Sequence, residues 1–330
     1  MSLVRGPLFD DEGPGSPAWS TLTRQPQKAE LYRVDAQARE AWSALRDLFG
    51  PAGAIDLLQR ITFLLFKPEA VKRRCLARTL EFMRAAGFTP VALRVFTINR
   101  NMAHQVWRYQ WNIASVDRLE LCTLIAEETQ SMLVVFRDDA PESGLPAAVR
   151  LWGLKGSSKA RHLESHLLRA VLGLSNRMLG FVHCSDEPAD VLREMGIFLA
   201  ADERLALARE VAAWRDGGIS DRLDDAVLRL EQAYRAHSVD AAEVRARLAS
   251  RPGPPALRAL LADIEQGRRR PLSWIRAGFP DLASDDDVRW DFIVLAAELI
   301  AHDLPGVSPI LDARALPVVR RGWIENVVDA

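Results

Sequence analysis

Cysteine is scarce in this chain of 330 residues, which contains three. Cys75, Cys122 and Cys184 lie far apart in the sequence, so they show neither the paired spacing of a disulfide framework nor that of a zinc site. Low and scattered cysteine usage is typical of proteins in a reducing compartment. We therefore expect a cytoplasmic protein.

Long apolar runs and an excess of one charge are also missing. No run approaches the roughly 20 residues that span a bilayer, and the N-terminus shows no basic-then-apolar signal pattern. The 43 Lys and Arg residues nearly balance the 44 Asp and Glu residues, which gives a formal net charge of −1. We therefore expect no binding to nucleic acid or to a membrane, while a nucleotide-sized partner is allowed.

The length and the 48% apolar content allow about two domains, each with its own core. Residues 1–35 are rich in Gly, Pro, Ser and charge, which predicts an irregular or disordered N-terminal arm. Residues 36–200 alternate between short apolar runs and amphipathic segments, whereas residues 201–330 show helical periodicity alone. The sequence therefore predicts a mixed domain followed by an all-helical C-terminal domain.

The order of the predicted elements suggests a fold. Strands are predicted at 61–66, 90–97, 131–137 and 180–183, and the principal helices between them at 71–86 and 188–198. Further helices are predicted at 36–49, in two stretches within 102–128, at 147–152, 161–171, 202–215, 220–237, 240–250, 255–267 and 287–302. With the short helices set aside, the order is β-α-β-β-α-β. We predict an α+β protein with a ferredoxin-like antiparallel sheet, helices on one face and an all-α region after it.

Two segments of the predicted sheet could carry chemistry. The strand at 61–66 runs directly into Lys67-Pro68-Glu69-Ala70-Val71, and Lys67 is one of five lysines set against 38 arginines. The strand at 180–183 ends on His183, which Cys184-Ser185-Asp186 follow. A neutral imidazole at a strand end is a competent nucleophile near pH 7, so His183 is a candidate acceptor of a phosphoryl group.

Together these segments resemble the nucleoside diphosphate kinase family over about residues 60–200. Residues 67–71 are similar to the family motif Lys-Pro-Asp-Gly/Ala-Val, and His183, Ser185, Asp186 and Glu194 match the family in one register. The resemblance implies that the γ-phosphate of a nucleoside triphosphate passes through phosphorylated His183 to a nucleoside diphosphate or an altered small-molecule acceptor. It also implies that Glu194 holds the imidazole and that Lys67 contacts the γ-phosphate.

The resemblance implies further nucleotide contacts. Arg169 and Arg150 lie within one position of family arginines that clamp phosphate, and an arginine fork suits bidentate phosphate binding. Lys155 stands where the family has a threonine that contacts phosphate, and Trp107 where it has an aromatic, usually tyrosine, near the nucleotide. The predicted nucleotide-binding residues are Lys67, Trp107, Arg150, Lys155, Arg169 and Ser185. Mg²⁺ with ATP is the implied cofactor, and a homo-oligomer is expected because family members are commonly oligomers.

The sequence departs from the family where sugar and base are bound. Gly180 stands where the family has an asparagine that contacts the sugar, and Asn176 could replace it only through an insertion. Residues 117–121 contain no match for the aromatic that stacks on the base. These departures leave a second hypothesis open, a catalytically inactive nucleotide-binding or protein-interaction module of the same shape.

Two histidines and one cysteine that match no residue of the family motifs need no functional role. His162 and His166 flank Glu164 at helical spacing and could present two metal ligands, but no third ligand follows at a suitable distance, so we predict no metal site. Cys184, beside His183, is interpreted as a packing residue.

Overall fold

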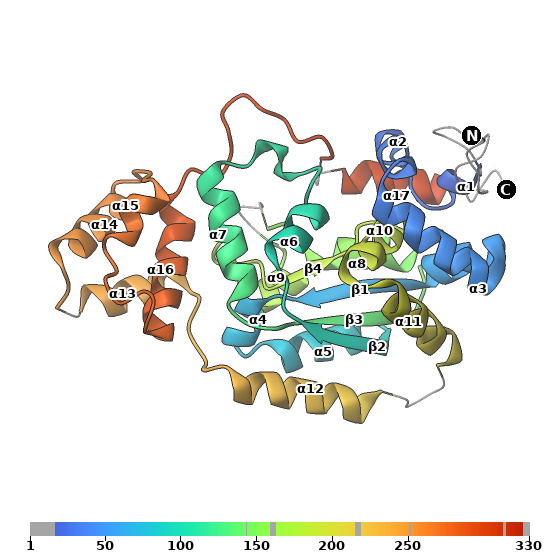
Figure 1. Cartoon of the computed structure of the whole chain (residues 1–330), viewed down its shortest axis with the longest axis horizontal. Helices are drawn as coiled ribbons and strands as arrows, with labels where there is room; N and C mark the ends of the chain where they lie inside the picture. Colours follow the sequence, from blue (N-terminus) through green and yellow to red (C-terminus); the bar gives the residue numbers. More distant parts are fainter. Residues whose placement is uncertain are drawn as a thin grey trace.

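The computed structural model (Figure 1) describes residues 17–142, 144–158, 163–214, 219–250, 252–312 and 315–325. Its centre is a four-stranded antiparallel sheet in the order β2-β3-β1-β4. The strands are β1 (Ile61–Phe66), β2 (Phe88–Phe96), β3 (Ser131–Asp138) and β4 (Val182–Cys184). This arrangement confirms the α+β class and the predicted β-α-β-β-α-β order.

Both faces of the sheet are covered, so the expectation of helices on one face was wrong. The reason lies in the central strands: all six residues of β1 are buried, and a strand buried along its whole length needs cover on both sides. Phe63 and Leu65 of β1 pack toward α3 (Ala36–Arg60), α10 (Pro188–Phe198) and α11 (Ala201–Ala213). Leu64 and Phe66 pack toward α4 (Pro68–Lys72), α5 (Leu76–Ala85) and α12 (Ser220–Ala233).

The connections between the strands carry the smaller helices. Between β2 and β3 the chain forms α6 (Arg100–Val106), the short 3-10 helix η1 (Trp111–Ile113) and α7 (Val116–Glu127). Between β3 and β4 it forms α8 (Ala147–Lys155) and α9 (Leu168–Val171).

The helix predicted at 161–171 was wrong for residues 163–167, which are not helical, while residues 161 and 162 lie outside the described residues. Leu163 and Leu167 instead fold back onto Gly156, where φ is +81° and an added Cβ would lie 3.1–3.3 Å from their side chains. Tertiary packing therefore overrides the local helical pattern there.

The segment before α3 is ordered from residue 17 onward, which corrects the expected irregular arm. It forms α1 (Pro17–Ser20) and α2 (Pro26–Arg33), while residues 1–16 lie outside the described residues. Trp19 and Leu22 are fully buried against the core that includes α3 and α10. Composition alone missed this packing because part of it is made with distant residues, such as Ala189, whose N–H donates to the Leu22 carbonyl oxygen at 2.9 Å.

The region after residue 200 is helical, as predicted. Beyond α11 and α12 it forms α13 (Ala241–Ala249), α14 (Pro255–Glu265), α15 (Leu272–Arg276), α16 (Asp286–Leu299) and α17 (Leu316–Glu325). Figure 1 shows α13–α16 grouped beside α7, while α17 returns to the other end of the molecule near α1 and α2. No helix among the described residues is long and apolar enough to cross a membrane.

One buried carboxylate joins both chain ends to the sheet domain. Glu187, the residue before α10, accepts hydrogen bonds from Thr23 Oγ1 (2.7 Å), Lys28 Nζ (2.9 Å) and Trp323 Nε1 (3.1 Å). It also accepts from the backbone N–H of Arg24 and from Gln25 Nε2. Burial alone raises the pKa of Glu187, but Lys28 and these hydrogen bonds outweigh burial and hold the pKa below its usual 4.5.

We expect Glu187→Gln to lower the free energy of unfolding by about 3 kcal/mol at pH 7, since it removes half of a buried ion pair. Glu187 has a lowered pKa in the folded state, so its contribution is present above the unfolded-state pKa and is lost as the pH falls through the folded-state value. The difference between wild type and variant should therefore shrink below about pH 4.5. Glu142→Gln is the control for urea denaturation, because that half-exposed carboxylate pairs only with half-exposed Arg320 and should matter by at most about 1 kcal/mol. Equal losses in the two variants would contradict the role given to Glu187.

A close approach of α10 to α3 sets a second test. A Cβ on Gly196 of α10 would lie 2.2 Å from the carbonyl oxygen of Gln37 in α3, whereas one on Gly153 of α8 would meet nothing within 4 Å. We expect Gly196→Ala to cost about 2 kcal/mol or more because backbone must move. The same change at Gly153 should stabilise by roughly 0.5–1 kcal/mol through helix propensity. Urea denaturation of both variants tests this difference in sign, and a neutral Gly196→Ala would show that α3 and α10 can separate freely.

Candidate active site

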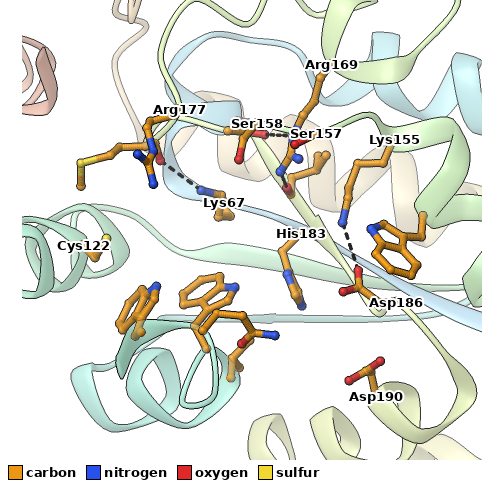
Figure 2. A pocket seen from close by; sticks show the side chains of 18 of the residues that line it. Lys67, Cys122, Lys155, Ser157, Ser158, Arg169, Arg177, His183, Asp186 and Asp190 are labelled. Carbon is orange, nitrogen blue, oxygen red and sulfur yellow. Dashed lines mark hydrogen bonds and ion pairs between the residues drawn. The ribbon is translucent and has the colours of Figure 1, made fainter. Parts of the chain in front are cut away.

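A cavity of about 440 Å³ lies at the end of β1, beside the start of the antiparallel strand β4. Its walls come from the segment after β1, the α6–α7 connection, the end of α8, the segment before β4 and the start of α10. The predicted site residues that line it are Lys67, Trp107, Lys155, Arg169, His183 and Glu194. The structure therefore brings most of the predicted residues to one place (Figure 2).

His183 is held by Glu194, which Ser185 holds in turn. It lies on β4, opposite Leu65 of β1, and its Nε2 is 2.8 Å from Glu194 Oε1 on α10. Ser185 Oγ donates to the other oxygen of Glu194 at 2.7 Å. Both carboxylate oxygens of Glu194 are thus used to fix the histidine and the turn that follows it.

The charge of Glu194 determines the tautomer of His183. Burial raises the pKa of Glu194, but His183 and the hydrogen bond from Ser185 outweigh burial and hold that pKa below its usual value. An ionised carboxylate can only accept hydrogen bonds, so Nε2 of His183 carries the proton. The lone pair of the ring is then on Nδ1, the nitrogen that can attack an electrophile.

Lys67 follows β1 and is fixed to the start of β4. Its Nζ lies 2.5 Å from Oε1 of fully buried Glu69 and 3.5 Å from the carbonyl oxygen of Met178. Glu69 Oε1 also accepts from the N–H of Phe181 at 3.2 Å, and the N–H of Lys67 donates to the Phe181 carbonyl at 2.9 Å. Phe181 has φ = +59°, a conformation unusual outside glycine, so this connection defines a sharp turn just before His183.

Lys155 supplies a second cation near His183. It ends α8, and its Nζ lies 3.6 Å from Asp186 Oδ1 and 3.5 Å from the carbonyl oxygen of Cys184. Figure 2 shows Lys155 on one side of His183 and Lys67 on the other. The nucleophile candidate is thus flanked by two ammonium groups, each already close to one carboxylate.

Arg169 lines the cavity but donates to the backbone around it. Its Nε, Nη1 and Nη2 donate to the carbonyl oxygens of Gly180 (3.2 Å), Gly156 (2.8 Å) and Val182 (2.9 Å). Burial lowers the pKa of Arg169. A Cβ at Gly180 would lie 3.2 Å from Arg169 Nη2, so the glycine leaves room for this guanidinium. In this arrangement Arg169 braces the segment before His183.

Arg150 does not reach the cavity, which corrects its predicted position. It forms a two-pronged pair with Asp138 (2.6 and 2.7 Å), donates to the carbonyl of Ala86 and covers the ring of Phe88. The cavity-lining residues of α8 include Trp152 and Lys155, three positions apart on one face of the helix. Position 150 is rotated by about 200° from Trp152, so its side chain faces away.

Trp111, Arg118 and Arg177 are among the cavity residues that the sequence analysis did not identify. The indole of Trp111 stacks on Trp107 at 4.9 Å, and Trp107 in turn meets the His183 ring edge-on at 5.5 Å. Arg118 of α7 and Arg177, before β4, also line the cavity. The spacing of Trp107 and Trp111 was the only available signal, since nothing in the sequence marks two of 38 arginines.

Two weighed alternatives are not supported by the geometry. Asn176 uses its side-chain oxygen to accept from the N–H of Met178 at 2.8 Å, so it stabilises a local turn.

His162 lies outside the described residues, and His166 is exposed and 3.5 Å from Glu164 in a non-helical segment. Within the described ranges, no group of three or more His, Cys, Asp or Glu residues could hold a metal ion. Burial raises the pKa of Cys184 to about 11, which fits a packing role.

Comparison with known proteins identifies the sheet domain. Residues 60–204 match the family model described as nucleoside diphosphate kinase. A nucleoside diphosphate kinase from Nocardioides sp. is 31% identical over 137 residues, which cover 42% of this chain and 94% of that protein. One from Methanocaldococcus jannaschii is 25% identical over 142 residues, covering 43% and 94%. A crystal structure of the Aquifex aeolicus enzyme aligns with 44% of this chain and 97% of its own, at 20% identity and a TM-score of 0.36.

These matches span nearly the whole length of the relatives and coincide with the segment that builds the cavity and places Glu194 against His183. Through residues 60–204, the chain belongs to the nucleoside diphosphate kinase family.

Proposed function

We propose that this chain is a phosphotransferase that carries the γ-phosphate of a nucleoside triphosphate on His183. The observation that supports it best is the pairing of His183 Nε2 with Glu194 at 2.8 Å, with Ser185 on the second carboxylate oxygen. This pairing leaves Nδ1 as the nucleophile and places the imidazole at the wall of a cavity large enough for a small ligand.

The reaction divides into two steps that use the same nitrogen. In the first, Nδ1 of His183 attacks the γ-phosphorus, the bond from that phosphorus to the bridging oxygen breaks, and the nucleoside diphosphate leaves with the electron pair. The phosphorylated ring keeps its Nε2 proton, and the negative charge of Glu194 stabilises the positive imidazolium. In the second, an acceptor oxygen attacks the same phosphorus, the P–N bond breaks and neutral His183 is restored.

Lys67 and Lys155 are the proposed cations for the transferred group. Negative charge spreads over the outer oxygens of a transferring phosphoryl group, and compact ammonium groups can follow that charge. Lys67 is 15% exposed at its side chain and Lys155 8%, so both act where water screens little. Trp107 and Trp111 form an apolar wall for the rest of the donor.

Mg²⁺ fits this site as part of the donor. Proteins usually hold Mg²⁺ through one or two carboxylates together with substrate phosphates, and Asp186 lines the cavity as a carboxylate of that kind. When bound, the ion neutralises phosphate charge, while the residues of the chain position the donor and His183.

The acceptor is a nucleoside diphosphate or a small molecule that differs from it, because Gly180 offers no side chain for a sugar hydroxyl. We assign the reaction to the domain of residues 36–200 and regard residues 201–330 as a helical addition. The proposed compartment is the cytoplasm. A homo-oligomer is part of this proposal.

A non-catalytic nucleotide-binding module is the second candidate. The observation that favours it is that positively charged side chains of the cavity already bind groups of the protein itself. Arg169 donates to three carbonyl groups, and Lys67 lies 2.5 Å from Glu69. If these contacts persist when nucleotide binds, few donors are left for the transition state.

The first test is formation of a phosphoenzyme with Mg²⁺ and γ-labelled ATP. We expect acid-labile, base-stable label on the wild type and none on His183→Ala, because the attacking Nδ1 is gone. The matched control is His166→Ala, which removes an exposed histidine and should label like the wild type. ATP binding without label on the wild type would favour the non-catalytic module.

The second test concerns Glu194→Gln, which keeps the shape of the side chain and removes its charge. We expect phosphorylation of His183 to slow by roughly 10- to 100-fold, since the imidazolium loses its counter-charge and the ring loses its fixed tautomer. Single-turnover labelling measures this rate, and ATP affinity should stay within about threefold because Glu194 faces the histidine. An unchanged labelling rate would remove Glu194 from the mechanism.

A further inference from the structure

Two arginines on the cavity wall share one carboxylate from the C-terminal region. Arg118 Nη1 and Arg177 Nη2 donate to different oxygens of Asp303, the latter at 3.0 Å. Arg118 comes from α7 and Arg177 from the segment before β4, so two separate elements converge on this point. Both arginines line the cavity that contains His183, and their side chains are 14% and 28% exposed.

The segment that carries Asp303 is held without these ion pairs. Residues 301–311 run along the α6–α7 connection, with an antiparallel bridge between Ala114 and Asp303. The hydrogen bonds between this segment and that connection include Ser115 N to His302 O, Ser115 Oγ to Ala301 O, Leu304 N to Ile113 O, Asn112 Nδ2 to Ser308 O, Ile310 N to Asn112 Oδ1 and Leu311 N to Tyr109 O. These contacts hold the segment in place independently of the ion pairs that the Asp303 side chain makes with the two arginines.

The single carboxylate of Asp303 has too few acceptor oxygens for all the N–H donors of the two guanidinium groups. Each guanidinium has five N–H groups, and Arg118 Nε is buried without a hydrogen-bond partner among the described residues. Arg118 and Arg177 thus bring two positive charges to the same carboxylate. Such a pair suits an oxyanion with more oxygen atoms or more charge than a single carboxylate.

We propose that Arg118 and Arg177 form an oxyanion-binding subsite for a carboxylate or phosphate group of a small ligand, with Asp303 as an internal competitor. Figure 2 shows Arg177 and Lys155 on opposite sides of His183, so the subsite lies apart from the Lys155 side of the cavity. The ligand class is then an anionic small molecule that bears a charged group distant from Lys155, with an apolar middle against Trp107 and Trp111.

Binding of an anion at this subsite does not depend on phosphoryl transfer at His183. Its residues make no contact with His183 or Glu194, so the His183→Ala variant should retain it. Failure of the phosphoenzyme assay would leave the subsite intact, and failure of the binding assay below would leave phosphoryl transfer intact.

The test is calorimetric titration of the full chain at low ionic strength with inorganic phosphate and, separately, malonate. We expect Asp303→Asn to bind at least one of these probes about tenfold or more tightly than the wild type, because the competing charge is gone. Adding Arg177→Met to Asp303→Asn should abolish the gain, whereas adding Lys155→Met should keep it. Tighter binding of phosphate alone identifies a phosphate ligand, and tighter binding of malonate as well extends the class to carboxylates.

Circular dichroism of each variant checks that the fold is kept. Asp303→Ala gives a second route to the same comparison should the asparagine variant not fold. Equal affinities of wild type and Asp303 variants for both probes would overturn the proposal. So would a gain that survives Arg177→Met and is lost with Lys155→Met, since the anion would then bind beside His183.

Discussion

The buried carboxylate of Glu187 is the constraint on which the arrangement of the molecule depends. A buried charge is tolerated only when it is paired and fully hydrogen-bonded, and Glu187 meets this condition with donors from residues 23–28 and from Trp323. It stands directly before α10, four residues after His183 and seven before Glu194. The same group that attaches both chain ends therefore fixes the start of the helix that holds the histidine.

The site combines a well-ordered histidine with cations that already have partners. His183, Glu194 and Ser185 form a closed hydrogen-bonded set that needs no ligand to be complete. Lys67, Arg169 and Arg177 instead contact carboxylates or carbonyl groups of the protein. A phosphate entering the cavity has to compete with these contacts, so affinity and selectivity depend on how readily each is exchanged.

The sequence predicted the sheet and the contact of His183 with Glu194 well because both depend on local patterns. A six-residue run with five apolar residues defined β1, and the fixed spacing from His183 to Glu194 needed only a strand end followed by a helix. Residues whose position depends on helix rotation or distant partners were less predictable. A slip of one residue was enough to misplace Arg150, and the partners of Arg169 are backbone carbonyls that no residue type reveals. Asp303 lies 126 residues from Arg177, so its contact could not be inferred from either segment alone.

The link between Trp323 and Glu187 also bears on how the chain matures during synthesis. Residues 23–28 emerge first, yet their acceptor appears only when residue 187 has been made, and the last donor follows 136 residues later. Contacts of such long sequence separation form slowly because a large loop must close first. Helices α1 and α2 can therefore complete their packing only after residue 323 has been made, which makes their docking a late step relative to the folding of the sheet.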